Sequence, residues 1–349
     1  MKIYSGPLLT EENFVQSQIG IQDSKVVEFE EGGDEGEDAI IIPTFVNAHT
    51  HSGDSFIRCA PEGTIEEVVG PGGIKHRALN DVDENVIIEC MRSFFTEAQK
   101  NGIYDVIEFR EGGIEGVSSI KKAIEALDKN LNIQIFGRPS QRKYDENEFK
   151  KLLSLSDGIG LSAYRDWDKD EFFKMAKEVN GKGTPFALHC SEDAREPLED
   201  ILHYDIHHLV HMIEAAVDDL QRCAESNIPI VICPRSNMQF GKIPNIPLMV
   251  ENGVTLSLGT DNAMLASPDM FREMEFAYRT SRLKGGVTAE DILMMATWNP
   301  RESLYPSLNV GKTNKKEDTY MVLDTKGYEP AYEVVTRSSP RDIKDIVVL

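Results

Sequence analysis

Residues 41–54 read IIPTFVNAHTHSGD, an apolar run that stops at His49, Thr50 and His51. Successive side chains of a strand point to opposite faces, so the two histidines face the same way. Two imidazoles at the end of a buried strand can reach one metal ion, and imidazole nitrogen suits zinc or iron. A His-x-His pair alone is equally compatible with two ordinary polar residues at a strand end. The rest of the chain has to decide between these interpretations.

The chain after residue 41 alternates short apolar runs with amphipathic segments. The apolar runs predict strands at 41–47, 104–109, 132–137, 158–163, 185–190, 206–211, 228–233 and 254–260. The amphipathic segments predict helices at 84–101, 115–128, 145–154, 168–180, 194–203, 214–226, 245–252 and 268–284. About eight strand–helix units over roughly 250 residues favour a (β/α)₈ barrel of the TIM type. The main rival is a doubly wound dinucleotide-binding sheet, but the sequence lacks its Gly-x-Gly-x-x-Gly turn.

Both ends of the chain have a different texture. Residues 1–40 alternate apolar and polar residues in short bursts, which predicts antiparallel strands. Three more short strands are expected from TYMVLD (319–324), YEVVTR (332–337) and DIKDIVVL (342–349). We therefore expect residues 1–40 and 306–349 to form one small β-sandwich domain beside a barrel of residues 41–305.

Residues 52–82 form a long connection, rich in glycine and proline, between the first expected barrel strand and its helix. Connections of this length in compact domains are usually functional lids or disordered segments. The loops that follow barrel strands carry the active site, so we favour a lid.

Composition excludes several classes of partner. The 349 residues are 40% hydrophobic and 28% charged, as in an ordinary globular enzyme, and the net charge is −22. Such a field repels nucleic acid and anionic membrane, which leaves a small-molecule substrate and, optionally, a second copy of the chain as expected partners. The five cysteines are odd in number and contain no Cys-x-x-Cys, which favours reduced thiols in the cytoplasm. Neither a signal peptide nor an apolar run of membrane-spanning length is evident.

Polar residues gather where the expected barrel strands end. A barrel of this type carries its chemistry at the C-terminal ends of its strands. Four histidines and one aspartate end such strands, and they are His49, His51, His189, His211 and Asp261. Their convergence predicts a mononuclear metal site with room for a water molecule.

Other candidate residues have two interpretations each. His208 lies earlier in the sixth expected strand and is an alternative to His211 as its functional histidine. His76 lies in the long connection, where it contacts substrate or is solvated. Glu192 follows His189 and is either a proton carrier for hydrolysis or a helix-start carboxylate that favours the helix N-terminus.

The order of the motifs resembles the amidohydrolase superfamily. The resemblance rests on PTFVNAHTHSGDS (43–55), the step from His189 to Glu192, VICPRSNMQFG (231–241), SLGTDNAM (257–264) and ATWNPRESL (296–304). It covers nearly the whole chain, and within the superfamily the chain is similar to the cytosine deaminase and chlorohydrolase-like metal-dependent hydrolases.

The resemblance implies a role for each matched residue. His49, His51, His189 and Asp261 would hold one divalent metal, with zinc favoured and iron or manganese as alternatives. His211 would polarise the substrate or the attacking water, and Asp261 would accept the water's proton. Glu192 would protonate a ring nitrogen and then the departing amine. The fourth strand, DGIGLSAYRDW (157–167), lacks the bridging Lys or Glu of binuclear members, which favours a single metal.

The expected function is therefore a deaminase of a small nitrogen heterocycle, similar to a nucleobase or a nucleoside. An alternative on the same scaffold opens a ring amide or displaces a halide or alkylamine. A non-catalytic metal-stabilised scaffold is a third hypothesis, which the complete ligand set disfavours. Arg138, Asn237 and His76 are candidate substrate contacts, although an ion pair between loops explains Arg138 as well.

Overall fold

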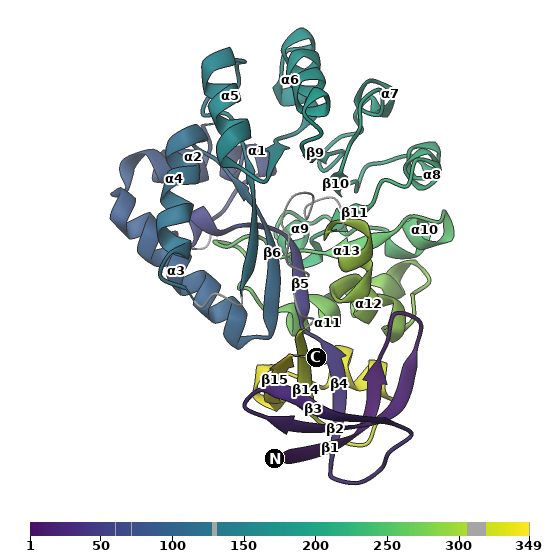
Figure 1. The fold of residues 1–349 in the computed structure, drawn as a ribbon. Helices are drawn as coiled ribbons and strands as arrows, with labels where there is room; N and C mark the ends of the chain where they lie inside the picture. Colours follow the sequence, from purple (N-terminus) through teal and green to yellow (C-terminus); the bar gives the residue numbers. More distant parts are fainter. Residues whose placement is uncertain (60, 71, 128–130, 306–318, 349) are drawn as a thin grey trace.

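The computed structural model describes residues 1–59, 61–70, 72–127, 131–305 and 319–348, which form two separate sheets (Figure 1). The central sheet has nine strands in the order β12-β11-β10-β9-β8-β7-β6-β5-β13. The other sheet is closed, in the order β1-β2-β3-β15-β14-β4, and comes from the two ends of the chain. Among the described residues, no helix is long and apolar enough to cross a membrane.

Every pairing in the central sheet is parallel. Its strands are β5 (Phe45–His51), β6 (Ile103–Arg110), β7 (Asn132–Gly137), β8 (Gly158–Leu161), β9 (Phe186–Cys190), β10 (His208–His211), β11 (Ile230–Ile232), β12 (Leu256–Leu258) and β13 (Asp261–Asn262). The end strands β12 and β13 are separated by only Gly259 and Thr260. A Cβ atom on Gly259 would lie 2.8 Å from the backbone nitrogen of His49, so glycine lets the chain pass beside β5. The sheet is therefore strongly curled.

Helices follow most strands and lie around the sheet (Figure 1). They are α3 (Glu84–Lys100), α4 (Gly113–Ile124), α5 (Glu146–Leu155), α6 (Lys169–Gly181), α7 (Leu198–Ile201), α8 (Val217–Glu225), α9 (Pro234–Met238), α10 (Ile246–Glu251), α11 (Met270–Ser281), α12 (Ala289–Ala296) and α13 (Trp298–Ser303). Asp83, Asp145, Asp168 and Asp269 cap α3, α5, α6 and α11 by accepting backbone N–H bonds. The helix expected at 194–203 is shorter, because α7 starts only after Pro197.

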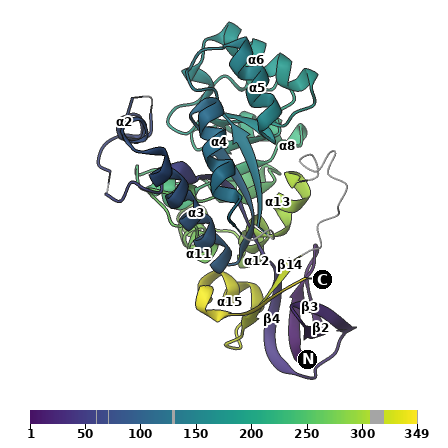
Figure 2. The same cartoon turned by 60° about the vertical axis from the view of Figure 1, so that its left-hand side comes forward.

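The terminal sheet corrects two expectations. Its strands β1 (Lys2–Leu9), β2 (Phe14–Gln22), β3 (Lys25–Glu31), β4 (Glu37–Pro43), β14 (Thr319–Asp324) and β15 (Ile343–Val348) close into one barrel instead of a two-sheet sandwich. The expected strand 332–337 is wrong, because it lies in helix α15 (Pro330–Thr336). Pro330 occupies the first helical position and the Glu329 carboxylate accepts from two backbone N–H groups, which starts the helix. Figure 2 shows α15 between the terminal sheet and the central part.

The junction between the two sheets lies at Thr44. The Thr44 N–H donates to Thr319 in the terminal sheet, and the Phe45 N–H donates to Gly102 at the start of β6. The expected strand 41–47 is therefore wrong, because residues 41–43 belong to β4 and residues 45–47 to β5. As a consequence β5 is displaced towards the C-terminus, and it contains His49 and His51.

The long connection 52–82 is largely ordered. It contains the short helices η1 (Ser52–Asp54), α1 (Ile65–Val68) and α2 (Ile74–Asp81). The Thr64 side chain caps α1 in a reciprocal capping box with Glu67. Expectations for residues 306–318 fall outside the described residues.

Candidate active site

Three histidines and one aspartate meet at one edge of the central sheet, where β5 and β9 end and β13 begins. His49 and His51 lie on β5, His189 on β9 and Asp261 at the start of β13, and one ligand atom from each lies within 4.8 Å of the others. The Nε2 atoms of His51 and His189 are 3.2 Å apart. Asp261 Oδ1 lies 3.4 Å from His49 Nε2 and 3.6 Å from His51 Nε2. One small ion can therefore contact all four side chains.

The hydrogen bonds around these rings fit a metal. The Nδ1 atoms of His51 and His189 lie 3.0 and 2.8 Å from the carbonyl oxygens of Phe109 and Leu161, so each Nδ1 donates a proton. The Nε2 atom of each ring is then unprotonated and directs a lone pair at the other ring. These two lone pairs repel each other unless a cation lies between them. Both ring nitrogens of His49 are buried without a hydrogen-bond partner. A divalent ion between the rings would relieve the repulsion and would bind one of the two nitrogens of His49.

The protonation states also suit metal binding. Burial lowers the pKa of His49, and burial holds the pKa of His189 well below its usual value. Burial and the charge of Lys75 lower the pKa of His51 to about 3. Burial alone would raise the pKa of Asp261, but its contact with His49 and the neighbouring His211 hold it well below the usual range. Neutral imidazoles and an ionised carboxylate are the forms that bind metals.

A second group shares Asp261. Glu192 and His211 each place one ligand atom within 4.8 Å of the Asp261 carboxylate, and His211 Nε2 lies 3.6 Å from Glu192 Oε2. The Asn237 side-chain NH₂ lies 3.2 Å from both Glu192 Oε1 and His211 Nδ1. Because Nδ1 accepts from this amide, the ring proton of His211 is on Nε2 and faces the site. Burial raises the pKa of Glu192, which favours a protonated carboxyl.

Backbone strain accompanies these positions. His211 and Asp261 have φ angles of +78° and +59°, and Ser191, beside His189, has a φ of +48°. These residues are not glycine, so the left-handed conformation is unfavourable and must be held by the surroundings. For Asp261 the Ser236 hydroxyl donates to Oδ2 at 2.5 Å and the Asn262 amide donates to Oδ1 at 3.1 Å. The strained strand ends aim their side chains at the common centre.

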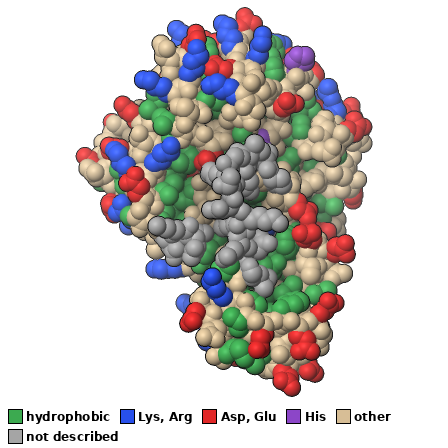
Figure 3. Space-filling model, in the orientation of Figure 1, with side chains coloured by type: hydrophobic (Ala, Val, Ile, Leu, Met, Phe, Trp, Pro, Cys, Tyr) green, Lys and Arg blue, Asp and Glu red, His purple; other side chains and the backbone are tan. Residues whose placement is uncertain are grey.

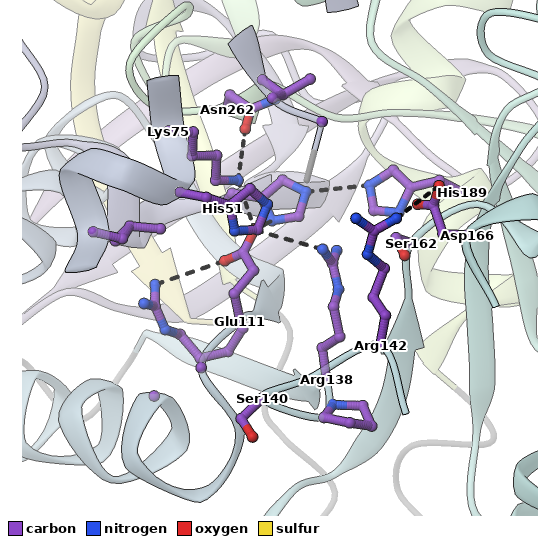
Figure 4. Close-up of a pocket in the computed structure, with 18 of the residues that line it drawn as sticks. His51, Lys75, Glu111, Arg138, Ser140, Arg142, Ser162, Asp166, His189 and Asn262 are labelled. Carbon is purple, nitrogen blue, oxygen red and sulfur yellow. Dashed lines mark hydrogen bonds and ion pairs between the residues drawn. The ribbon is translucent and has the colours of Figure 1, made fainter. Parts of the chain in front are cut away.

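A buried ionic network adjoins the ligand set (Figure 4). Glu111 Oε1 lies 2.8 Å from His51 Nδ1 and accepts from Lys75 Nζ at 2.6 Å. Lys75 also donates to Asn262 Oδ1 at 2.8 Å and lies 3.4 Å from Asp54. The sequence prediction missed Lys75, since nothing in the connection 52–82 distinguishes it from a solvated lysine. Its importance follows only from contacts with residues far along the chain.

The remaining candidates take three different places. Arg138 and His76 line a cavity of about 1100 Å³, which also reaches His51, His189, Glu192, His211 and Asp261. Asn237 is 1% exposed and contacts Glu192 and His211. His208 belongs to neither cluster, since its Nδ1 lies 2.6 Å from His207 Nδ1 in the interior of the sheet. His211 is the sixth-strand histidine that faces the cavity.

The amidohydrolase family profile matches residues 40–345. The chain belongs to the amidohydrolase family. It is a metal-dependent hydrolase that acts on carbon–nitrogen bonds.

Three similar proteins give this assignment its context. A Methanothermobacter thermautotrophicus protein, which has been named provisionally as an aminohydrolase, is 30% identical over 99% of this chain and 96% of its own length. The 5-methylthioadenosine/S-adenosylhomocysteine deaminase of Haloquadratum walsbyi is 29% identical, over 85% of this chain and 74% of its own length. The crystal structure of a Xanthomonas campestris adenosine deaminase with bound zinc has the same fold, with a TM-score of 0.76, 15% identity and coverage of 99% and 91%.

Proposed function

We propose that this amidohydrolase is a mononuclear aminohydrolase that deaminates a nucleobase- or nucleoside-like heterocycle. The observation that carries the proposal is Glu192, whose side chain is 16% exposed, shares a cluster with Asp261 and His211 and lies beside the four candidate metal ligands. A hydrolase that releases ammonia must move a proton from water to a nitrogen leaving group, and a carboxyl at this place can carry it. The deaminase names of the relatives agree with this chemistry.

His49, His51, His189 and Asp261 would hold one divalent ion, which supplies Lewis acidity and a water of lowered pKa at neutral pH. Three imidazoles and one carboxylate favour zinc, with iron and manganese as alternatives. The zinc in the adenosine deaminase of the same fold supports this choice. Strand β8 (GIGL) carries neither Lys nor Glu, which supports a single ion per chain.

Four polar side chains hold or move protons in the proposed reaction. They are Asp261, which is also a metal ligand, His211, Asn237 and Glu192. Asp261 accepts the proton of the attacking water. His211 directs its Nε2–H towards the reacting oxygen, and Asn237 keeps the ring in that tautomer. Glu192 begins protonated and gives its proton to the ring nitrogen. Once ionised, it takes the remaining proton of the added hydroxyl group and passes it to the amine, which leaves as ammonia, and the proton held by Asp261 then restores Glu192. Burial raises the pKa of Glu192, which favours the protonated form that this step requires.

We also infer that the curled sheet is a complete (β/α)₈ barrel whose eighth strand is divided into β12 and β13. Strands β5 and β9 are four positions apart in the sheet, which would separate them by about 19 Å if it were flat. The ring centroids of His49 and His189 are instead 4.9 Å apart. We place the boundary of the small terminal domain at Thr44 and the protein in the cytoplasm, which the five free cysteines support.

A screen for ammonia release tests the function. The zinc-loaded protein should release ammonia from at least one compound in a panel of purines, pyrimidines, pterins and their nucleosides. Glu192→Gln should keep its metal and lose about 10²- to 10⁴-fold in kcat, because the proton carrier is gone. Glu199→Gln is the matched control, since Glu199 is a nearby exposed glutamate whose side chain is 64% accessible. Full activity in Glu192→Gln would exclude the proposed role, and chloride release or ring opening without ammonia would favour the alternative hydrolase.

A further inference from the structure

Two loops bring three arginines to one wall of the cavity. Arg138 and Arg142 follow β7, and Arg165 follows β8, the strand that pairs with β7. All three line the cavity that contains the ligand set. The backbone of Arg138 is fixed, because its N–H donates to Arg110 and its carbonyl accepts from Gly113. Arg138 is therefore held at the end of the sheet, whereas Arg142 lies farther along the loop that follows β7.

Arg138 is a buried cation without a close counter-ion. Its side chain is 13% exposed, and its Nε donates to the Gly160 carbonyl at 3.3 Å. The nearest carboxylate oxygen among the described residues is Glu111 Oε1, 3.9 Å from Nη1 and beyond hydrogen-bonding distance. That oxygen already contacts Lys75 at 2.6 Å and His51 at 2.8 Å. Most of the N–H groups of Arg138 are left to face the cavity.

Glu111 is shared by several cations, of which only Arg138 lacks a second carboxylate within 4.0 Å in the described part of the chain. Lys75 also lies 3.4 Å from Asp54, and Arg110 lies 3.9 Å from Glu108. Lys75, Arg110 and Arg138 all lie within 4.0 Å of this one carboxylate, which is closest to Lys75. A guanidinium removed from water without a hydrogen-bonded anion is costly, and an anion in the cavity would remove that cost. The planar group suits the two oxygens of a carboxylate or a phosphate.

Arg142 adds a second guanidinium on the same wall. In Figure 4 the side chains of Arg138 and Arg142 both extend towards the part of the cavity that holds His51 and His189. Arg142 is 43% exposed, and its closest carboxylate oxygen, on Asp166, is 3.7 Å away. The alternative to a ligand role is a loose surface ion pair, which contributes little.

We propose that Arg138 and Arg142 form an anion subsite that binds a carboxylate or phosphate group carried by the substrate. Arg165 lies at the rim of this subsite. The net charge of −22 repels anions in general, so a local cationic wall is required to admit one. This inference rests on the proposed function in one respect: the bound molecule is taken to be the heterocycle that is deaminated.

Matched pairs of compounds test the subsite. The pairs are adenosine with adenosine 5′-monophosphate, and 5′-methylthioadenosine with S-adenosylhomocysteine. In at least one pair, the member that carries the phosphate or the carboxylate should have a kcat/KM about 10-fold or more higher than the partner without that group. The pair that shows the preference distinguishes phosphate from carboxylate.

Three variants identify the residues. Arg138→Gln should lower kcat/KM for the preferred anionic compound about 10- to 100-fold and leave the neutral partner within about threefold. Arg138→Lys should recover part of the loss, because the charge remains without the planar fork. Arg222→Gln is the control for Arg142→Gln, since Arg222 is 46% exposed and 3.8 Å from Glu199, far from the cavity wall. Equal losses for both members of a pair would overturn the subsite.

Calorimetry separates this proposal from the proposed function. The same four compounds and inorganic phosphate are titrated into the zinc-loaded Glu192→Gln protein, with and without Arg138→Gln. Arginine-dependent binding of an anionic compound to this variant, together with no ammonia release by the wild-type protein from any compound of the panel, would support the subsite and refute the deaminase. Ammonia release without an anion preference would support the deaminase and refute the subsite. Binding of no anionic compound more tightly than adenosine would overturn the subsite.

Discussion

Single residues set the chemistry of this site through the atoms that hold them. His51 and His189 present lone pairs to each other because each uses its other nitrogen on a backbone carbonyl. Sequence patterns singled out His49, His51, His189 and Asp261 because each was expected to end a strand, and the structure brings these four side chains together. They could not identify Lys75 or the bond between Asn237 and His211, because those contacts join residues 26 to 187 positions apart. Such pairs depend on side-chain direction in the folded chain, which a single sequence does not show.

Glu273 offers a pH test at this scale. It is fully buried, accepts from the Arg235 N–H at 2.9 Å, and burial raises its pKa to about 7 despite the charge of Arg235. An acid whose pKa is raised on folding stabilises the protein fully below its unfolded pKa, near 4.5, and loses that contribution as the pH rises through 7. The lost contribution is about 3 kcal/mol. The wild-type free energy of unfolding should therefore fall between pH 5 and pH 8 by about this much more than that of Glu273→Gln.

Urea titrations at both pH values check this difference. Glu275→Gln is the control, because Glu275 is on the same helix and its side chain is 43% exposed. A parallel change in the free energy of unfolding of wild type and Glu273→Gln between pH 5 and pH 8 would contradict this prediction. It would mean that folding does not raise the pKa of Glu273.

At the scale of elements, hydrophobic pattern predicted the strands and helices of the central sheet well. The strand at 41–47 failed because one continuous apolar run, IIPTFV, serves two sheets, and only the partners of Thr44 and Phe45 show where it divides. The segment YEVVTR failed because its β-branched residues favour a strand, whereas Glu329 and Pro330 start a helix. Tertiary contacts decided the first case, and a local pattern does not contain them. The second case was decided by a helix start that lies just before the expected strand and outside its hydrophobic pattern.

The connection 52–82 is linked to the metal centre by one side chain. Lys75, on α2, is 3% exposed and bonds Glu111 and Asn262, which in turn contact His51 and Asp261. Lys75→Met should weaken zinc binding about 10- to 100-fold, because the groups that orient two ligands lose their common partner. It also leaves the buried Glu111 without its closest counter-ion. Chelator competition measures the affinity.

Arg77→Met is the matched control, because Arg77 lies on the same helix, is exposed and bonds only the Gly72 carbonyl in the described part of the chain. Limited proteolysis of both variants reports whether residues 52–82 have loosened. Unchanged zinc affinity in Lys75→Met would mean that α2 covers the site without contributing to it.

On the scale of the whole molecule, both chain ends return to one small barrel, while the metal ligands join distant strands of the larger sheet. Acidic side chains are spread over both parts on the face shown in Figure 3. The sequence predicted that the two termini combine, since both have the alternation of short strands. It could not predict closure of the terminal sheet, which depends on the pairing of β3 with β15 and of β1 with β4. The first pairing joins segments more than 300 residues apart. The second joins two nearby strands with similar hydrophobic patterns.

Removal of the metal should destabilise the whole fold. The ligands come from β5, β9 and β13, so one ion links strands from separate parts of the curled sheet. Binding at a thousand times the dissociation constant adds about 4 kcal/mol to the native state, which corresponds to a fall in Tm of roughly 5–15 °C on chelation. Without the metal, His51 and His189 also keep two lone pairs that face each other across 3.2 Å, and their repulsion lowers the stability further. Differential scanning fluorimetry of zinc-loaded and chelated protein measures the shift.

His76→Ala should show the wild-type shift in Tm, because His76 lines the cavity and is outside the ligand set. His189→Ala should show little shift, because it removes one of the four ligands. An unchanged Tm on removal of a metal known to be bound would mean that the sheet holds the four ligands in place without the ion.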